Sequence, residues 1–190
     1  INPEITTAHN NLKNRDSHFI FGDVCTAAVI EKDSKSPNKF KILNAKLKTH
    51  FSNNIRNNFG FMNFIEDKKY TEEELLFVQN GRSVFKEVMP MVASLISDHL
   101  EENNLLPDQV EQYWLHQANI NMNTYVVKKL LGDDFPAERA PNVLDEYANT
   151  GSAGSLISFH KYNHLTAGQK GIICSFGAGY SICSILVEKA

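Results

Sequence analysis

The sequence predicts an α/β fold with a mixed sheet, because short apolar runs of strand length alternate with amphipathic helices. Residues 113–116 form an apolar run that ends on a histidine, and a helical pattern begins within three residues. Near the C-terminus, residues 171–176 and 181–187 are two further apolar runs, separated by a glycine-containing turn. A strand that ends on His116 presents its imidazole at the carboxyl edge of the sheet, where ligands of open α/β folds bind.

The first third of the chain predicts extended structure. Residues 18–21 and 27–30 are two short apolar segments around Gly22 and Asp23, a pair typical of turns. Residues 40–51 alternate apolar and polar side chains, as a half-buried strand does. Residues 52–70 are rich in asparagine with interspersed aromatic side chains, and two interpretations stay open for them: a packed surface loop or the lip of an apolar pocket.

Helices follow. Thr71 and Glu74 resemble a capping box, which predicts a helix that runs on through a core-facing stripe to about residue 96. Gly81 and Pro90 lie inside this pattern and predict a break or a kink. The helix after His116 has Asn119 as its expected N-cap and ends before Gly132. Two more helical patterns are expected at residues 142–147 and 156–160.

Composition narrows the classes of partner. The net charge of −3 provides no general attraction to nucleic acid or to an anionic membrane, so we expect neither partner. No apolar stretch is long enough to span a bilayer. The three cysteines have no metal-type spacing, so we expect no metal site, and their odd number suits a reducing compartment, for which we predict the cytoplasm.

Three segments bring polar groups to the predicted edge of the sheet: His116, Asn149 and the turn at residues 177–179. A neutral histidine and an asparagine amide both donate hydrogen bonds, so together they suit an enolate or oxyanion. The glycine-rich turn exposes backbone N–H groups that suit a second oxyanion. Cys25 is a candidate nucleophile, because the chain order Cys, His, Asn matches papain-like enzymes, but its surroundings are those of a strand interior.

These motifs, taken together and in order, resemble the ketoacyl synthase III group of the thiolase superfamily. The similar stretches cover nearly the whole chain from residue 18 on and are the following: Phe-Gly-Asp at 21–23, Gly-Arg-Ser-Val-Phe-Lys at 81–86, His-Gln-Ala-Asn at 116–119, Asn-Thr-Gly-Ser-Ala at 149–153 and Ser-Phe-Gly-Ala-Gly-Tyr at 175–180.

The resemblance implies two similar α/β halves, each with a five-stranded mixed sheet flanked by helices. Residues 1–38 would then be the last strands of the first half with a linker, and residues 39–190 the C-terminal domain. In the family the nucleophilic cysteine belongs to the first half, so the resemblance implies that this chain lacks it and is inactive alone. It also implies an acyl-coenzyme A substrate, an acyl carrier protein partner, a homodimer and no bound cofactor.

The resemblance further implies a role for each site residue. His116 and Asn149 would hold the malonyl thioester oxygen during decarboxylative condensation, and Ala178 would donate its N–H to the tetrahedral oxyanion. Phe176 would lie against the reacting groups, beside Gly177 and Gly179. The resemblance also implies that Lys128 and Lys129 bind the carrier protein, although an ordinary solvated helix face explains these lysines too. The family often has a basic residue two positions after the His-Gln-Ala-Asn motif, and this position is Asn121 here. Alternatives at this stage are an acyltransferase of the same fold and a non-catalytic scaffold subunit.

Overall fold

The structure is a computed structural model that describes residues 1–15, 17–32, 35–57 and 75–190. A four-stranded mixed sheet lies at its centre, in the order β3-β8-β7-β6. The central strand β8 is antiparallel to both of its neighbours, whereas β6 is parallel to β7. The four strands are β3 (Phe40–Ser52), β6 (Gln112–Leu115), β7 (Lys170–Gly177) and β8 (Gly179–Lys189). The predicted α/β class with a mixed sheet is confirmed.

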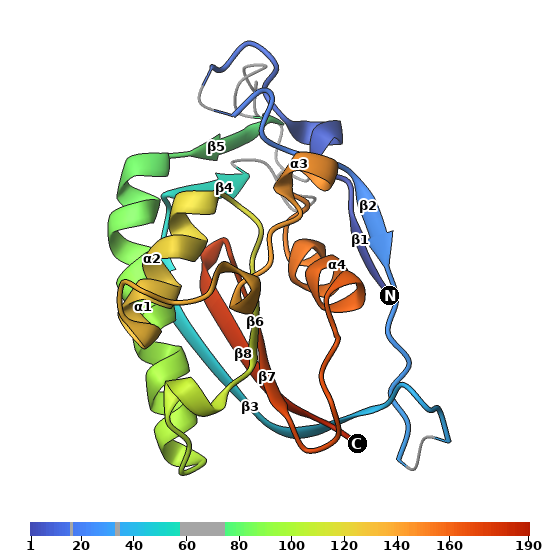
Figure 1. The fold of residues 1–190 in the computed structure, drawn as a ribbon. Helices are drawn as coiled ribbons and strands as arrows, with labels where there is room; N and C mark the ends of the chain where they lie inside the picture. The colour runs from blue at the N-terminus through green and yellow to red at the C-terminus, as the bar shows by residue number, and fades with distance from the viewer. Residues whose placement is uncertain (16, 33–34, 58–74) are drawn as a thin grey trace.

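Helices cover both faces of this sheet (Figure 1). The long helix α1 (Gly81–Glu102) and α2 (Ile120–Leu131) pack together on one face, and α4 (Ala153–Lys161) packs on the other. The short helix α3 (Leu144–Tyr147) precedes α4. Two small antiparallel ribbons complete the fold: β1 (Asn2–Glu4) with β2 (Val24–Thr26), which contacts α4, and β4 (Ile55–Asn57) with β5 (Phe77–Gln79). Single 3-10 turns occupy Thr6–His9, Pro107–Gln109 and Ala137–Arg139.

Each face of the sheet has its own core. The larger cluster fills the space between α1, α2 and the sheet, and its fully buried members include Val88, Met89 and Ile96. A smaller aromatic cluster lies under α4, where the rings of Trp114 and Phe159 meet edge to face with their centroids 4.8 Å apart. Aromatic pairs of this geometry stabilise by about 0.5–1.5 kcal/mol beyond the area they bury. The sheet is thus fixed from both sides, which holds its carboxyl edge in place.

The prediction for α2 is confirmed at both ends. The side chain of Asn119 accepts a hydrogen bond from the backbone N–H of Asn121 at 2.8 Å, as an N-cap does. Gly132 ends the helix with φ of 87°, a conformation that favours glycine. The helices expected near residues 142–147 and 156–160, and the strands on both sides of the 177–180 turn, are also present.

The expected start of the long helix is wrong within the described residues. Phe77–Gln79 is a strand that pairs with β4, and α1 begins only at Gly81, the position where a break was expected. The reason is local, because the side chain of Asn80 accepts a hydrogen bond from the N–H of Ser83 at 3.2 Å and caps the helix there. The proposed cap at Thr71 and most of the 52–70 segment lie outside the described residues.

Other expectations need correction. Residues 18–20 form turns and 27–30 have no regular structure, while the strand between them is Val24–Thr26. The strand β3 is mostly exposed, not half-buried, and a register shift between Ile42 and Asn44 interrupts its alternation. Four strands, not five, form the main sheet of the described residues. The domain boundary at residues 38 and 39 stays a prediction.

The described residues contain neither a membrane-spanning helix nor a cluster of metal-ligating side chains. No helix there is long and apolar enough to cross a membrane. No group of three or more His, Cys, Asp or Glu side chains in that part of the chain is arranged to hold a metal ion.

Candidate active site

His116 follows β6 directly and lies at the carboxyl edge of the sheet, with 7% of its surface exposed. The parallel register places Leu115 opposite Cys174, so His116 lies beside Ser175 one position further on. Its Nδ1 lies 2.8 Å from the Ser175 Oγ. The Phe176 ring packs against the imidazole with centroids 4.3 Å apart. The ring is therefore held on two sides, while Nε2 has no protein partner among the described residues.

Burial determines the charge of this histidine. It lowers the pKa of His116 to about 4, so the imidazole is neutral at pH 7. Protonation here would place an unpaired cation in a desolvated site. A neutral ring that donates a hydrogen bond fits this environment better than a base that gains a charge.

Asn149 is held by its backbone and by one side of its amide. Its N–H donates to the Ile20 carbonyl at 2.9 Å, and its own carbonyl accepts from the Gly22 N–H at 3.0 Å. The side-chain Oδ1 accepts from the Gly151 N–H at 3.1 Å. Because Oδ1 is occupied in this way, the Nδ2 group is the part of the side chain that remains to donate.

Two close approaches fix the loops around Asn149. A Cβ atom at Gly22 would lie 2.2 Å from the Tyr147 carbonyl oxygen, so only glycine fits there. On the other side, the Glu4 carboxylate accepts hydrogen bonds from the Ser152 backbone at 3.0 Å and from its hydroxyl at 2.6 Å. The amino-terminal ribbon thus holds the loop that carries Asn149.

The turn between β7 and β8 is anchored behind the site. Tyr180 is fully buried, and its hydroxyl donates to the Glu87 carboxylate of α1 at 2.9 Å. Asn54 donates to the same oxygen at 3.1 Å. Ala178 at the tip of the turn is exposed. The network holds the turn against α1 and leaves its tip accessible.

A cavity of about 1040 Å³ connects these groups. It brings together five of the predicted site residues: His116, Asn149, Phe176, Gly177 and Ala178. Gly179 does not line it, and Lys128 and Lys129 lie elsewhere, on α2. The rest of the wall is largely apolar and includes Leu47, Ile55, Phe85, Met122 and Ile182. The arrangement offers two neutral donors to one largely apolar space, which suits an oxygen of a thioester that gains negative charge.

None of the three cysteines has the surroundings of a nucleophile in this chain. Cys25 is exposed on β2 and does not line the cavity. Cys183 lines the cavity, but burial raises the pKa of its thiol. Burial raises the pKa of the Cys174 thiol too. The described residues therefore supply stabilising donors to the cavity and no activated thiol.

Sequence reasoning missed Ser175 and Glu4. The position of Ser175 could be found only from the parallel register of β6 and β7, which no local pattern reveals. Glu4 is separated from Ser152 by 148 residues, so no spacing in the sequence links the two.

Comparison with known proteins places this site in a family. Residues 100–189 match the family described as 3-oxoacyl-[acyl-carrier-protein] synthase III C terminal. This stretch contains His116, Asn149 and the whole 177–179 turn. Over residues 100–189 the chain is similar to this family. The resemblance inferred from its motifs is confirmed.

Curated ketoacyl synthase relatives match along the entire chain. A β-ketodecanoyl-[acyl-carrier-protein] synthase of Pseudomonas aeruginosa is 52% identical over 192 residues, which is 100% of this chain and 55% of that protein. A β-ketoacyl-[acyl-carrier-protein] synthase III of Wolbachia pipientis is 27% identical over 99% of this chain and 56% of its own length. The chain therefore spans little more than half the length of the curated relatives it matches.

Solved structures agree on the fold. The β-ketoacyl-[acyl-carrier-protein] synthase III of Thermus thermophilus superposes with a TM-score of 0.75 at 20% identity, over 99% of this chain and 57% of that one. A 3-oxoacyl-[acyl-carrier-protein] synthase of Burkholderia xenovorans gives 0.71 at 18% identity, over 99% of this chain and 54% of that one. The thiolase-like fold is thus shown.

Proposed function

We propose that the whole protein is a condensing enzyme that joins an acyl-coenzyme A primer to a malonyl group on acyl carrier protein. The observation that carries this proposal is the pair of neutral donors, His116 and Asn149, in the wall of one largely apolar cavity. The names of the relatives support it, since they are synthases that act on acyl carrier protein substrates.

The chemistry assigns the donors to the decarboxylation step. The carbon–carbon bond to the malonyl carboxylate breaks, carbon dioxide leaves, and the electron pair passes into the thioester as an enolate. His116 Nε2–H and Asn149 Nδ2–H donate to the oxygen on which this charge develops. The enolate carbon then attacks the carbonyl carbon of an acyl group bound as a thioester to a cysteine of the enzyme.

The turn between β7 and β8 stabilises the second oxyanion. Attack on the acyl thioester gives a tetrahedral intermediate, and the Ala178 N–H at the turn donates to its oxygen. The intermediate collapses, the cysteine sulfur leaves as thiolate, and the new β-ketoacyl group stays on the carrier. Phe176, which packs against His116, keeps water away from the enolate. Gly177 and Gly179 flank Ala178 and leave the space around its N–H free of side chains.

The nucleophilic cysteine is proposed to belong to a preceding α/β half of the whole protein. The spans of 55% and 56% of the curated relatives support this. Large apolar side chains also stand exposed on the described chain, among them Val29, Ile30 and Phe51 at 78–85% exposure. An apolar surface of this kind suits contact with a second half and with a second copy in a homodimer. An exposed free thiol at Cys25 suits the cytoplasm.

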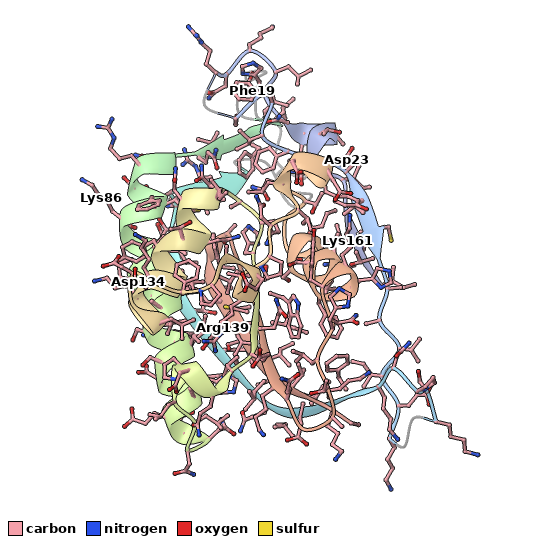
Figure 2. All side chains as sticks on the ribbon, viewed as in Figure 1. Phe19, Asp23, Lys86, Asp134, Arg139 and Lys161 are labelled. Carbon is pink, nitrogen blue, oxygen red and sulfur yellow. The ribbon has the colours of Figure 1, made fainter. Side chains whose placement is uncertain are left out.

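Carrier-protein docking is proposed for the basic end of α2. Lys128 forms a surface ion pair with Asp133 at 3.1 Å, and Lys129 lies 5.8 Å from the Tyr125 ring centroid. An exposed ion pair contributes only about 0–1 kcal/mol to stability, so the Lys128 ammonium remains available to an acidic partner. The Lys129 ammonium has no ion pair in the described residues and is available too. Lys86 projects outward from the neighbouring helix α1 (Figure 2).

The primer is proposed to carry eight carbons. The Pseudomonas aeruginosa relative is named for a ten-carbon β-ketoacyl product, and this chain is 52% identical to it. Condensation with malonyl adds two carbons after carbon dioxide is lost, so a ten-carbon product requires an eight-carbon primer. The apolar wall of the cavity suits an alkyl chain.

The test is an assay of the full-length enzyme with malonyl carrier protein and either octanoyl- or acetyl-coenzyme A. We expect carbon dioxide release and a β-ketodecanoyl carrier by intact mass, with octanoyl favoured over acetyl. Ester or amide formation without carbon dioxide release would indicate the same-fold acyltransferase instead. Absence of acyl transfer from every coenzyme A thioester would leave only a scaffold subunit.

A further inference from the structure

Ser175 provides the polar contact of His116, and both residues line the cavity. The two residues follow the last register pair of β6 and β7, at the carboxyl edge of the sheet. The Ser175 Oγ lies 2.8 Å from Nδ1 of the imidazole, a normal hydrogen-bond length. The other nitrogen, Nε2, belongs to a ring that lines the cavity.

The hydrogen count decides what this contact does. A neutral imidazole carries one N–H, either at Nδ1 or at Nε2. With the proton on Nδ1, the ring would donate to Ser175 and present the Nε2 lone pair to the cavity, where it would repel an enolate oxygen. With the serine hydroxyl as donor to Nδ1, the ring proton must lie on Nε2 and point into the cavity.

Among the residues that the structure describes, Nδ1 of His116 is the sole hydrogen-bond partner given for the Ser175 hydroxyl. Among the described residues, no ion pair or hydrogen bond joins the His116 ring to a carboxylate that would draw the proton to Nδ1. The hydroxyl is therefore free to donate to Nδ1.

We propose that Ser175 is a positioning residue that holds His116 in the tautomer with its proton on Nε2. This inference rests on the proposed function, in which Nε2–H donates to the enolate oxygen. Phe176 complements the serine, because its ring fixes the plane of the imidazole while the hydroxyl fixes its proton.

The chain offers a matched control. Ser184 makes the same contact with His99, from Oγ to Nδ1 at 2.9 Å, but this pair is fully buried and does not line the cavity. Ser184→Ala removes a hydroxyl from a serine–histidine pair of the same geometry at a site without chemistry. A loss of activity common to both variants would thus report general loosening of the fold.

The experiment compares Ser175→Ala, Ser175→Thr and Ser184→Ala in the full-length enzyme. Two quantities are measured: kcat and KM for carbon dioxide release from malonyl carrier protein, and the His116 tautomer from the ¹⁵N resonances of histidine-labelled protein. We expect Ser175→Ala to lower kcat about three- to tenfold at unchanged KM, in line with the loss of one neutral hydrogen bond. The Nδ1–H population should rise in the same variant.

Rescue and control complete the test. Ser175→Thr keeps the hydroxyl and suits a strand, so it should restore kcat and the Nε2–H signature. Ser184→Ala should match the wild type in both measurements. Wild-type kcat with an unchanged tautomer in Ser175→Ala would overturn the proposal. If the wild-type enzyme releases no carbon dioxide, the proposed function fails, and the tautomer measurement still decides the role of Ser175.

Discussion

Two serine–histidine pairs share one geometry and differ in what surrounds the second ring nitrogen of the histidine. His116 with Ser175 and His99 with Ser184 have Oγ to Nδ1 distances of 2.8 and 2.9 Å. Burial lowers the pKa of both histidines; for His99 the nearby Lys46 ammonium lowers it further. The Nε2 atom of His99 is buried with no hydrogen-bond partner in the described chain, whereas His116 lines the cavity together with Asn149.

The position of a histidine in the fold, and not the residue type, therefore decides whether its second ring nitrogen can take part in chemistry. At the core position between α1 and β8 the unused nitrogen is a cost to stability. At the sheet edge the corresponding nitrogen, Nε2 of His116, can donate a hydrogen bond to a substrate oxygen. Substitution of His116 should therefore lower activity, whereas substitution of His99 should lower stability.

The largest effect is expected from His116→Ala in the full-length enzyme. Loss of a preorganised donor to a developing oxyanion should lower kcat for decarboxylation by about 10²–10³-fold. The measurement is carbon dioxide release from malonyl carrier protein at saturating substrate. A kcat within twofold of the wild type would show that the cavity-facing nitrogen has no role.

Asn149→Asp removes the second donor while it keeps Oδ1 as acceptor for the Gly151 N–H. The new oxygen in place of Nδ2 repels the enolate, so we expect kcat to fall by about 10²-fold. Steady-state decarboxylation kinetics measure this, with a thermal unfolding scan as the control for folding. An Asn149→Asp enzyme as active as the wild type would remove Asn149 from the site.

His99→Ala should affect stability instead. The substitution leaves a cavity in the core and strands the Ser184 hydroxyl, so the free energy of unfolding should fall by about 2–4 kcal/mol. Denaturant titration measures it. The kcat of the folded fraction should stay near the wild-type value, and a specific loss as large as that of His116→Ala would contradict the distinction between the pairs.

A dependence on pH should be common to both pairs. The pKa of each histidine is lower in the folded state than in the unfolded state, where it is about 6.5. The unfolded chain therefore binds more protons as pH falls below 6.5, and stability is lost from there, for His116 down to its folded-state pKa of about 4. Each group contributes at most about 1.4 kcal/mol per pH unit.

Unfolding titrations at pH 7 and pH 5 test this dependence. The decrease in stability should be smaller in His116→Ala and in His99→Ala than in the wild type. An equal decrease in all three proteins would show that neither ring is held neutral by the fold.

The sequence predicted structure best where neighbouring residues alone decide the local conformation. Strand ends, helix caps and tight turns depend on neighbouring residues. Three features were therefore predictable: the strand before His116, the Asn119 cap and the turn between β7 and β8. The start of α1 was not, since the Asn80 cap and the pairing of β5 with β4 decide it. Ser175 and Glu4 were not either, because strand register and a contact 148 residues apart have no local pattern.

The most direct measurement is a crystal structure of the full-length enzyme with a non-hydrolysable malonyl thioester analogue. We predict that the thioester oxygen lies within about 2.7–3.1 Å of both His116 Nε2 and Asn149 Nδ2. Ser175 Oγ should remain at hydrogen-bond distance from Nδ1 in that complex. A thioester oxygen bound elsewhere in the cavity, with His116 and Asn149 both without contact to it, would contradict the account.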